Sequence, residues 1–481
     1  MVEYDIIPTI KKIQRKLKKD FTHNKMNAVL VEVAVLAEIY YEWNQFYCDD
    51  ELERICSIAA HYILKGLTEG WDNKKTKTNK KIILYCDTFG NDTRGLSLMY
   101  LKALLALNYE VIYVTRLDKM KDQPVLHKAL QGTDIIYEYV DFTVSYVIQV
   151  KTLNAIVQRY KPDIAFLYTK PYDVAVSAVF SQYEGKIERY KINLTDHAFW
   201  LGKSSFDYCV EFRNYGASIS YFKRKLEKNQ LIKLPYYPYE DKNITFEGLP
   251  FDEKTKFVFS GGSLYKTLGE GNKYYKMVEH ILQTDSTIRF VYAGSGDDSQ
   301  LRIISKRFPG RVIHIPERKD FVELIRRSVF YLNTYPTVGG QMMQYCAMAG
   351  KLPVTLRHNQ ASGGLLLNQK KLMIEFDSLE EIYAEIDRLL SDEQYRHERE
   401  ANLKSCVIKE SEFQNALALM INTHETMYEL EYLDIDTSEI AREYRFRIRE
   451  DVLVNAIAKK RHMPLFFKFS LYFLKRYRKL K

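Results

Sequence analysis

Apolar and polar positions change their spacing along this chain. Up to about residue 75, apolar residues recur every three or four positions, as in VLVEVAVLAEIYYEWNQF and LERICSIAAHYILKGL, which predicts amphipathic helices. From Lys81 onward, short runs rich in β-branched and aromatic residues, such as KIILYC, EVIYVT and DIAFLY, alternate with helical stretches. Strands that alternate with helices predict a parallel sheet with right-handed crossovers.

The same alternation starts again at Lys256, which predicts a second sheet. Five strands, KFVFSGG, TIRFVYAGSG, RVIHIP, VFYLNT and LPVTL, are each followed by a helix. Between the two series, LIKLPYYPYE with Pro235 and Pro238 has the stiff, extended character of an interdomain connection. We therefore expect an α/β protein with two doubly wound, Rossmann-like domains. The expected parts are a helical N-terminal subdomain (1–75), two Rossmann-like domains (81–240 and 250–425), and C-terminal helices with a basic amphipathic tail (426–481).

The second series contains a strand that runs into two glycines and a helix. The apolar run Val329–Leu332 stops at a loop with Pro336, and Gly339-Gly340 precede a helical stretch, Gln341–Ala349. A helix start behind glycines presents backbone N–H groups and a partial positive charge, which suits a diphosphate. The same arrangement recurs in doubly wound sheets without any ligand, so this stretch alone leaves both interpretations open. Gly339, Gly340 and Gln341 are candidate diphosphate-binding residues.

Three other loops add candidates for the same site. In SGGSLYKT, Lys266 follows Gly261 and Gly262 just past a strand, where its ammonium group could meet phosphate oxygens; the alternative is a solvated surface lysine. Arg318 lies before the glycine-bearing strand, where a guanidinium could also meet a phosphate. The loop RHNQASGG contains Ser362 and could close over a nucleotide.

The first domain offers a histidine. His197 follows a strand and lies on a loop between Asp196 and Trp200, which favours a functional role over that of a satisfied core histidine. Asp196 could orient its ring. Gly90 and Gly95, in an earlier loop, could let an acceptor approach closely or could simply form the turn.

The spacing of the cysteine and acidic residues does not predict a metal-binding site. The six cysteines are scattered without any CxxC pair, so neither a disulfide framework nor a zinc site is expected. Asp297-Asp298 sit where a helix begins, and acids are expected there without a ligand. We therefore expect no metal and no cofactor.

The net charge of +9 is concentrated at the end of the sequence. Nine Lys and Arg residues follow Asp451 with no acid, and the ending PLFFKFSLYFLKRYRKLK mixes cations with aromatic residues. This pattern predicts peripheral contact with an anionic membrane; the alternative is a helix that packs on the domain. No groove-reading motif accompanies it, so nucleic acid is not an expected partner.

Other sequence features bear on localisation. The sequence contains no apolar run of about 18 residues, which is the length needed to span a bilayer. Its first 20 residues carry too many charges for a signal peptide. We expect a cytoplasmic protein, peripheral at the inner face of the cytoplasmic membrane.

These motifs resemble the GT-B glycosyltransferases over about Lys81 to Leu390. FVFSGGSLYKT looks like the strand and Q-L-Y-K loop of the O-GlcNAc transferase family, which includes SPINDLY-like and adhesin-glycosylating bacterial relatives. The resemblance implies two domains facing across a cleft, with Lys266 binding the donor diphosphate. YLNTYPTVGGQMM is similar to the family segment that holds the same diphosphate, and TDHAFWLGKSSFDY is a weaker match that makes His197 a candidate catalytic residue.

The sequence departs from the family at two places. Two threonines of the diphosphate segment are replaced by Met342 and Met343, and the acid that would bind ribose falls near Tyr345 or Cys346. The resemblance implies metal-independent transfer of a hexosyl or N-acetylhexosaminyl group from a UDP-sugar to a glycan or lipid-linked acceptor, in surface polysaccharide biosynthesis. A protein O- or N-glycosyltransferase and a non-catalytic GT-B partner subunit are the alternatives.

Overall fold

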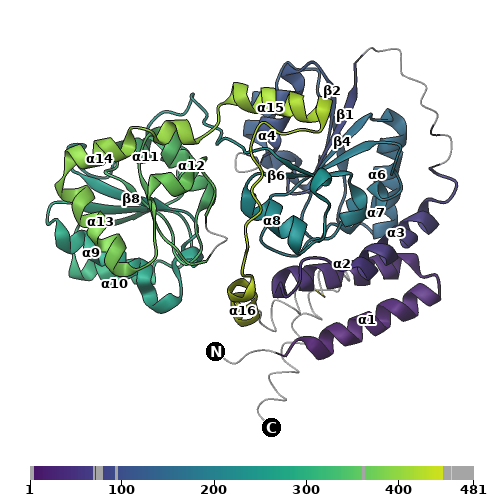
Figure 1. Ribbon diagram of the computed structural model, residues 1–481, viewed down its shortest axis with the longest axis horizontal. Helices are drawn as coiled ribbons and strands as arrows, with labels where there is room; N and C mark the ends of the chain where they lie inside the picture. Colours follow the sequence, from purple (N-terminus) through teal and green to yellow (C-terminus); the bar gives the residue numbers. More distant parts are fainter. Residues whose placement is uncertain are drawn as a thin grey trace, which may run out of the picture. The chain divides into compact units, whose positions relative to one another are not determined.

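Two parallel β-sheets organise the chain, one in each of two units (Figure 1). The computed structural model describes residues 5–68, 71, 80–92, 96–359, 363–447 and 457. The first unit comprises Met1–Leu234 and Gln414–Lys481, and the second comprises Pro235–Phe413. The first unit is thus built from both ends of the sequence.

The sheet of the first unit has seven strands in the order β3-β2-β1-β4-β5-β6-β7, all parallel. The strands are β1 (Ile82–Asp87), β2 (Glu110–Arg116), β3 (Ile136–Val140), β4 (Ile164–Tyr168), β5 (Glu188–Ile192), β6 (Tyr208–Glu211) and β7 (Leu231–Lys233). All six residues of β1 are buried, because helices cover both faces of a sheet of this type. The strand order reverses between β1 and β4, which makes this the switch point of the sheet.

Three N-terminal helices belong to the core of the first unit. They are α1 (Ile7–Thr22), α2 (Met26–Trp43) and α3 (Asp50–Leu64). Most of α2 is buried, and residues such as Val33 and Leu36 share one hydrophobic cluster with Leu84 of β1 and Val157 of α6. The Asp49 side chain caps α3 by accepting a hydrogen bond from the Leu52 N–H at 3.0 Å. The three N-terminal helices therefore help to bury the helices that connect the strands of this sheet.

The remaining helices of the first unit connect its strands or follow the second unit. They are α4 (Ser97–Ala106), α5 (Pro124–Ala129), α6 (Tyr146–Tyr160), α7 (Val174–Phe180), α8 (Asn214–Phe222), α15 (Glu410–Thr423), which begins in the second unit, and α16 (Ser438–Arg447). Helix α16 contacts α2, and the Gln45 side-chain amide donates to the Ala441 carbonyl at 2.7 Å. The basic segment after Lys459, predicted to contact a membrane, lies outside the described residues.

The second unit has a six-stranded parallel sheet in the order β10-β9-β8-β11-β12-β13. Its strands are β8 (Phe257–Gly261), β9 (Arg289–Ala293), β10 (Val312–Ile315), β11 (Tyr331–Leu332), β12 (Pro353–Leu356) and β13 (Glu375–Phe376). Its helices are α9 (Lys273–Thr284), α10 (Ser299–Arg307), α11 (Phe321–Arg327), α12 (Gly340–Ala349), α13 (Leu379–Ser391) and α14 (Glu393–Glu400). The order reverses between β8 and β11, so the switch point lies between these two strands.

The observed elements confirm the predicted fold class and refine two details. Helix α12 begins one residue before the predicted stretch and ends at Gly350, which has φ +75°. Leu231–Lys233, expected to be part of the extended connection, instead pairs with β6 as an edge strand. Strand β13 was not predicted. Within the described residues, no helix is both long enough and apolar enough to cross a membrane.

Candidate functional site

Two loops meet at the switch point of the second sheet. Strands β8 and β11 are parallel neighbours, so the loops after Gly261 and Leu332 leave the sheet at the same edge. The Thr337 N–H donates to the Lys266 carbonyl at 3.2 Å. The structure thus brings the lysine-bearing loop and the loop that leads to Gly339 side by side.

The lysine loop is anchored by buried groups. It forms a short 3₁₀ turn, η4 (Leu264–Thr267), in which Leu264 is buried and its N–H donates to the Ser295 carbonyl at 2.8 Å. The Thr267 hydroxyl donates to the Leu264 carbonyl at 2.7 Å and lies 2.6 Å from the Tyr275 hydroxyl. Between these anchors Lys266 is half-buried and Tyr265 is exposed. The backbone that presents Lys266 is therefore fixed by the core.

The glycines around this loop allow close backbone packing. A Cβ on Gly294 would lie 1.8 Å from the Gly262 carbonyl oxygen, and a Cβ on Gly261 would lie 2.9 Å from the Ala293 carbonyl oxygen. Gly262 itself has φ +126°, and no atom lies within 4 Å of the position its Cβ would take. Gly261 therefore allows the ends of β8 and β9 to lie close together, whereas Gly262 leaves open space beside the lysine loop.

The start of α12 presents backbone amides at the same edge. The side-chain oxygen of Asn333 accepts from the N–H groups of Thr334 at 2.9 Å and Gly339 at 3.0 Å, which fixes the loop before the helix. Gly339 is the N-cap, and no side chain caps the helix. The first N–H groups of an α-helix have no partner within the helix, so those of Gly340, Gln341 and Met342 are the donors that a bound anion could use.

Three other predicted residues, Gly340, Gln341 and Ser362, have different outcomes. A Cβ on Gly340 would lie 2.7 Å from a methyl group of Leu365, so a larger residue here would push the end of this flexible side chain aside. Gln341 is half-buried in the first turn of α12. Ser362 lies outside the described residues.

Arg318 is engaged in contacts within the protein. Its Nε donates to Asp320 at 2.7 Å, a second nitrogen also pairs with Asp320, and Nη1 donates to the Gly248 carbonyl at 2.7 Å. The guanidinium lies 5.4 Å from the centre of the Phe246 ring. Arg318 therefore fastens the segment around Gly248 to the start of α11, and no described contact joins it to the Lys266 loop.

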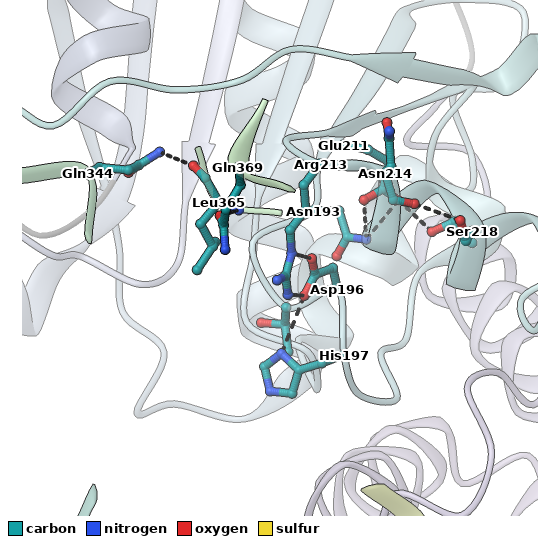
Figure 2. A network of polar contacts seen from close by, with 12 residues as sticks. Asn193, Asp196, His197, Glu211, Arg213, Asn214, Ser218, Gln344, Leu365 and Gln369 are labelled. Carbon is teal, nitrogen blue, oxygen red and sulfur yellow. Dashed lines mark hydrogen bonds and ion pairs between the residues drawn. The ribbon is translucent and has the colours of Figure 1, made fainter. Parts of the chain in front are cut away.

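The positions where the family has a ribose-binding acid are part of the core. Cys346 is fully buried, and Tyr345, which is 5% exposed, donates its hydroxyl to the Tyr239 carbonyl at 2.8 Å. The neighbouring Gln344 donates to the carbonyls of Tyr236 and Leu365 at 3.1 and 3.3 Å (Figure 2). Its side-chain oxygen is buried without a hydrogen-bond partner in the described part of the chain. Sequence reasoning missed Gln344; a polar residue on an otherwise buried helix face was the available signal.

His197 lies in the first unit, on the loop after β5. Its ring Nδ1 is 3.5 Å from Asp196, and its side chain is 38% exposed (Figure 2). Asp196 is mainly the partner of Arg213, which donates to both carboxylate oxygens at 2.6 and 2.9 Å. Burial alone would raise the pKa of Asp196, but the Arg213 guanidinium outweighs it and holds this pKa at about 2. Asp196 therefore stays ionised next to the histidine.

The histidine loop is held by buried side chains from several elements. Asn44, at the end of α2, donates to the His197 carbonyl at 3.0 Å and accepts from the Phe199 N–H at 2.9 Å. Arg224 donates to the Ala198 carbonyl at 2.6 Å. Glu53 of α3 accepts from the N–H groups of Gly202 and Lys203, and burial raises its pKa. The backbone around His197 is thus fixed while its ring remains accessible.

The described residues contain no group of three or more His, Cys, Asp or Glu side chains arranged to hold a metal ion. Asp297 accepts from the Ser299 N–H at 3.0 Å, and Asp298 is the N-cap of α10. The acid pair thus lies at a helix start, as the sequence analysis expected.

Comparison with known proteins gives structural relatives only. No protein-family model and no curated protein matches the sequence. The lipopolysaccharide outer core galactosyltransferase WaaB, in its apo form, matches with TM-score 0.50 and 13% identity, over 72% of this chain and 99% of its own. UDP-GlcNAc 2-epimerase from Neisseria meningitidis, bound to UDP-GlcNAc, gives the same TM-score, identity and coverage.

A mutant O-GlcNAc transferase from Thermobaculum terrenum also matches, over 92% of this chain and 81% of its own, with 14% identity and TM-score 0.49. Identities this low support a shared fold and do not transfer an activity. The chain has a GT-B-like α/β fold, with two parallel Rossmann-like sheets and N-terminal helices, and this fold is shared by glycosyltransferases and UDP-GlcNAc 2-epimerases.

Proposed function

We propose that this protein is a glycosyltransferase that moves a hexosyl or N-acetylhexosaminyl group from a UDP-sugar to an acceptor hydroxyl. The observation that carries the proposal is the hydrogen bond between Thr337 and Lys266, which joins the lysine loop to the loop before α12 at the switch point. An ammonium group and a set of helix-start amides at one sheet edge suit a diphosphate. WaaB is a galactosyltransferase, and the Neisseria epimerase binds UDP-GlcNAc, so nucleotide sugars are ligands of proteins with this fold.

In the proposed reaction the bond between the sugar's anomeric carbon and the diphosphate oxygen breaks, and a bond to the acceptor oxygen forms. Negative charge develops on the leaving diphosphate. The Lys266 ammonium and the amides of Gly340, Gln341 and Met342 would stabilise that charge without a metal. Arg318 stays a further candidate for this role; its Nε and Nη1 already donate to Asp320 and to the Gly248 carbonyl, so it would have to use its other N–H groups.

The acceptor hydroxyl must lose a proton as it attacks. We assign this proton to the His197 ring in an inverting reaction, since an imidazole can accept a proton near neutral pH. Asp196 lies 3.5 Å from the ring Nδ1 and could orient the ring for this role. Replacing His197 with Ala should therefore reduce turnover while leaving the affinity for UDP unchanged.

The test of the donor site is UDP binding by Lys266→Ala, measured by titration calorimetry. A hydrogen bond to a charged group contributes about 1.5–3 kcal/mol, so we expect the dissociation constant to rise by roughly 10- to 100-fold. The control is Lys276→Ala, which removes an exposed lysine of α9 in the same unit. An affinity equal to that of the unmodified protein would refute the site.

The acceptor is proposed to be a glycan or a lipid-linked glycan in surface polysaccharide assembly, with a polypeptide as the alternative. The structural relative WaaB, a lipopolysaccharide outer core galactosyltransferase, supports a glycan acceptor. Incubation with radiolabelled UDP-sugars and either membranes or protein acceptors separates the two, because label enters a lipid extract in one case and a protein precipitate in the other.

One observation favours a second function, that of a non-catalytic partner subunit. Tyr345 and Cys346 are buried where the family has a ribose-binding acid, and neither supplies a carboxylate. Slow UDP release from a panel of UDP-sugars without acceptor decides between the two functions. A catalytic protein should release UDP from at least one sugar by slow hydrolysis, whereas a silent partner should release none.

A further inference from the structure

Helix α1 is amphipathic, and the core of its apolar side is buried in the protein, while Ile7 in its first turn is 38% exposed. Ile10, Ile13 and Leu17 are 3–5% exposed and belong to the hydrophobic cluster that α1 shares with α2. These three residues recur at three- and four-residue spacing, so they form one ridge along the helix. This ridge supplies the apolar part of the packing of α1 against α2.

The opposite side of α1 carries five cationic residues. Lys11, Lys12, Arg15, Lys18 and Lys19 are all exposed, and we call them the α1 stripe. At about 100° per residue, they fall within an arc of roughly 120° directly opposite the apolar ridge, along about 12 Å of the helix. Pro8 and Thr22 are the other residues on this arc, so no acid interrupts it.

Two acids near α1 are paired with a lysine outside the stripe, whereas a third, Glu51 of α3, has its pKa lowered by Arg54 and also by Lys18 of the stripe. Lys16 lies 2.6 Å from Asp20 and 2.8 Å from Glu32, and both carboxylates are buried. Partial burial would lower the pKa of Lys16, but these two carboxylates outweigh it and raise this pKa. In contrast, no stripe residue forms an ion pair with another residue of the described chain. The stripe therefore presents its positive charge to the surroundings.

The stripe fits an extended anionic surface. It contains no aromatic residue on which a nucleic-acid base could stack, which disfavours a single-stranded nucleic acid. Helix α16 contacts α2, the packing partner of α1, and the chain continues from α16 into the segment that carries nine Lys and Arg residues. Several basic residues are needed for electrostatic binding to anionic lipid, and the α1 stripe supplies five.

We propose that the α1 stripe rests on an anionic phospholipid bilayer and holds the protein at that surface. The attraction would act on the lipid headgroups through charge alone, because the apolar ridge of α1 is buried in the protein. Binding should therefore weaken steeply as salt is added. This inference goes beyond the proposed transfer reaction and stands whether or not the protein binds UDP.

The test uses the full chain and vesicles of phosphatidylcholine with 30% phosphatidylglycerol at about 100 mM salt, where the Debye length is about 10 Å. The stripe variant replaces all five residues with Gln, which has nearly the same helix propensity as Lys and Arg. The control variant replaces five exposed lysines of the second unit with Gln, and so has the same net charge: Lys254, Lys256, Lys276, Lys306 and Lys370. Circular dichroism and thermal melts check that both variants are folded.

We expect the stripe variant to lose at least 30-fold in vesicle partitioning and the control variant less than threefold. Equal losses would overturn the proposal, since net charge alone would then explain binding. No loss in either variant would also overturn it, because the basic C-terminal segment would then suffice. Stronger binding of the unmodified protein to single-stranded DNA than to vesicles at the same salt would assign the stripe to nucleic acid. Lys266→Ala should bind vesicles normally, which separates this test from that of the donor site.

Discussion

At the scale of single residues, Lys191 shows how much polar chemistry is buried under the histidine loop. This residue of β5 is 4% exposed, lies 4.6 Å from the centre of the Trp200 ring, and donates to the Thr169 hydroxyl at 3.3 Å. Burial lowers its pKa to about 8. Below that pH, the folded protein keeps a charged ammonium group away from water, which opposes folding.

Replacing Lys191 with Met should stabilise the protein at neutral pH. The pKa is lower in the folded state, so the unfolded state binds more protons between pH 8 and 10.5, and the cost of burying the lysine fades as pH rises through that window. We expect a gain of up to about 3 kcal/mol in the free energy of unfolding at pH 7, falling towards zero near pH 10.5. Denaturant titrations across this range measure the difference.

Lys186→Met is the matched control, because Lys186 is exposed and also lies over an aromatic ring, 5.8 Å from the centre of Tyr183. Its effect should be small at every pH. A gain from Lys191→Met that does not change with pH would contradict the assignment of the cost to a buried charge.

At the scale of elements, the end of α2 and the histidine loop form one structural joint. Asn44 has φ +43° and ψ +50°, which ends the helix and turns its side chain towards the backbone of His197 and Phe199. Asn44 and His197 are 153 residues apart in the sequence. The N-terminal helices thus fix the loop that presents the candidate base.

Asn44→Ala should therefore destabilise the protein more than an ordinary loop substitution. Losing both contacts leaves a buried carbonyl and a buried N–H without partners, which costs about 1–3 kcal/mol in the free energy of unfolding. Asn24→Ala is the control, since Asn24 has a similar backbone conformation, φ +55°, but is exposed. If both variants lose the same stability in urea titrations, the conformation of the residue and not the joint is responsible.

At the scale of the whole molecule, the N-terminal helices are inseparable from the first unit. Val33 and Leu36 of α2 are buried in the same cluster as residues of β1 and α6. Removing residues 1–68 would expose this apolar surface to water.

We expect a chain lacking residues 1–68 to be insoluble or to lack cooperative unfolding. The measurement is size-exclusion chromatography followed by a thermal melt. The control is the stripe variant, which changes α1 only on its exposed side and should elute and melt as the unmodified protein does. A truncated chain that elutes as a monomer and unfolds cooperatively would contradict this account.

The sequence predicted the parts that depend on local pattern. The apolar runs that became β8 and β9 are continuous and bounded by glycines, and the helix after Gly339-Gly340 ends at Gly350 as predicted. Strands β7 and β13 are only three and two residues long, too short for a periodic signal.

The contacts that assign a role to a residue depended instead on tertiary structure. The hydrogen bond from Arg318 to the Gly248 carbonyl, and that from Asn44 to the His197 carbonyl, join segments that are distant in the sequence. That the Lys266 and Gly339 loops lie at the same edge could be predicted from the sequence, because each loop follows a strand of the same predicted parallel sheet.

The glycine contact beside the lysine loop sets a limit on how this protein can diverge. No side chain can replace the hydrogen of Gly294 without driving a carbon into the Gly262 carbonyl, so relatives that keep this loop pair should retain a glycine there. Gly262 faces open space, yet its φ of +126° is rarely adopted by residues with a side chain. A related sequence with a bulky residue at the position of Gly294 should therefore have a rebuilt lysine loop.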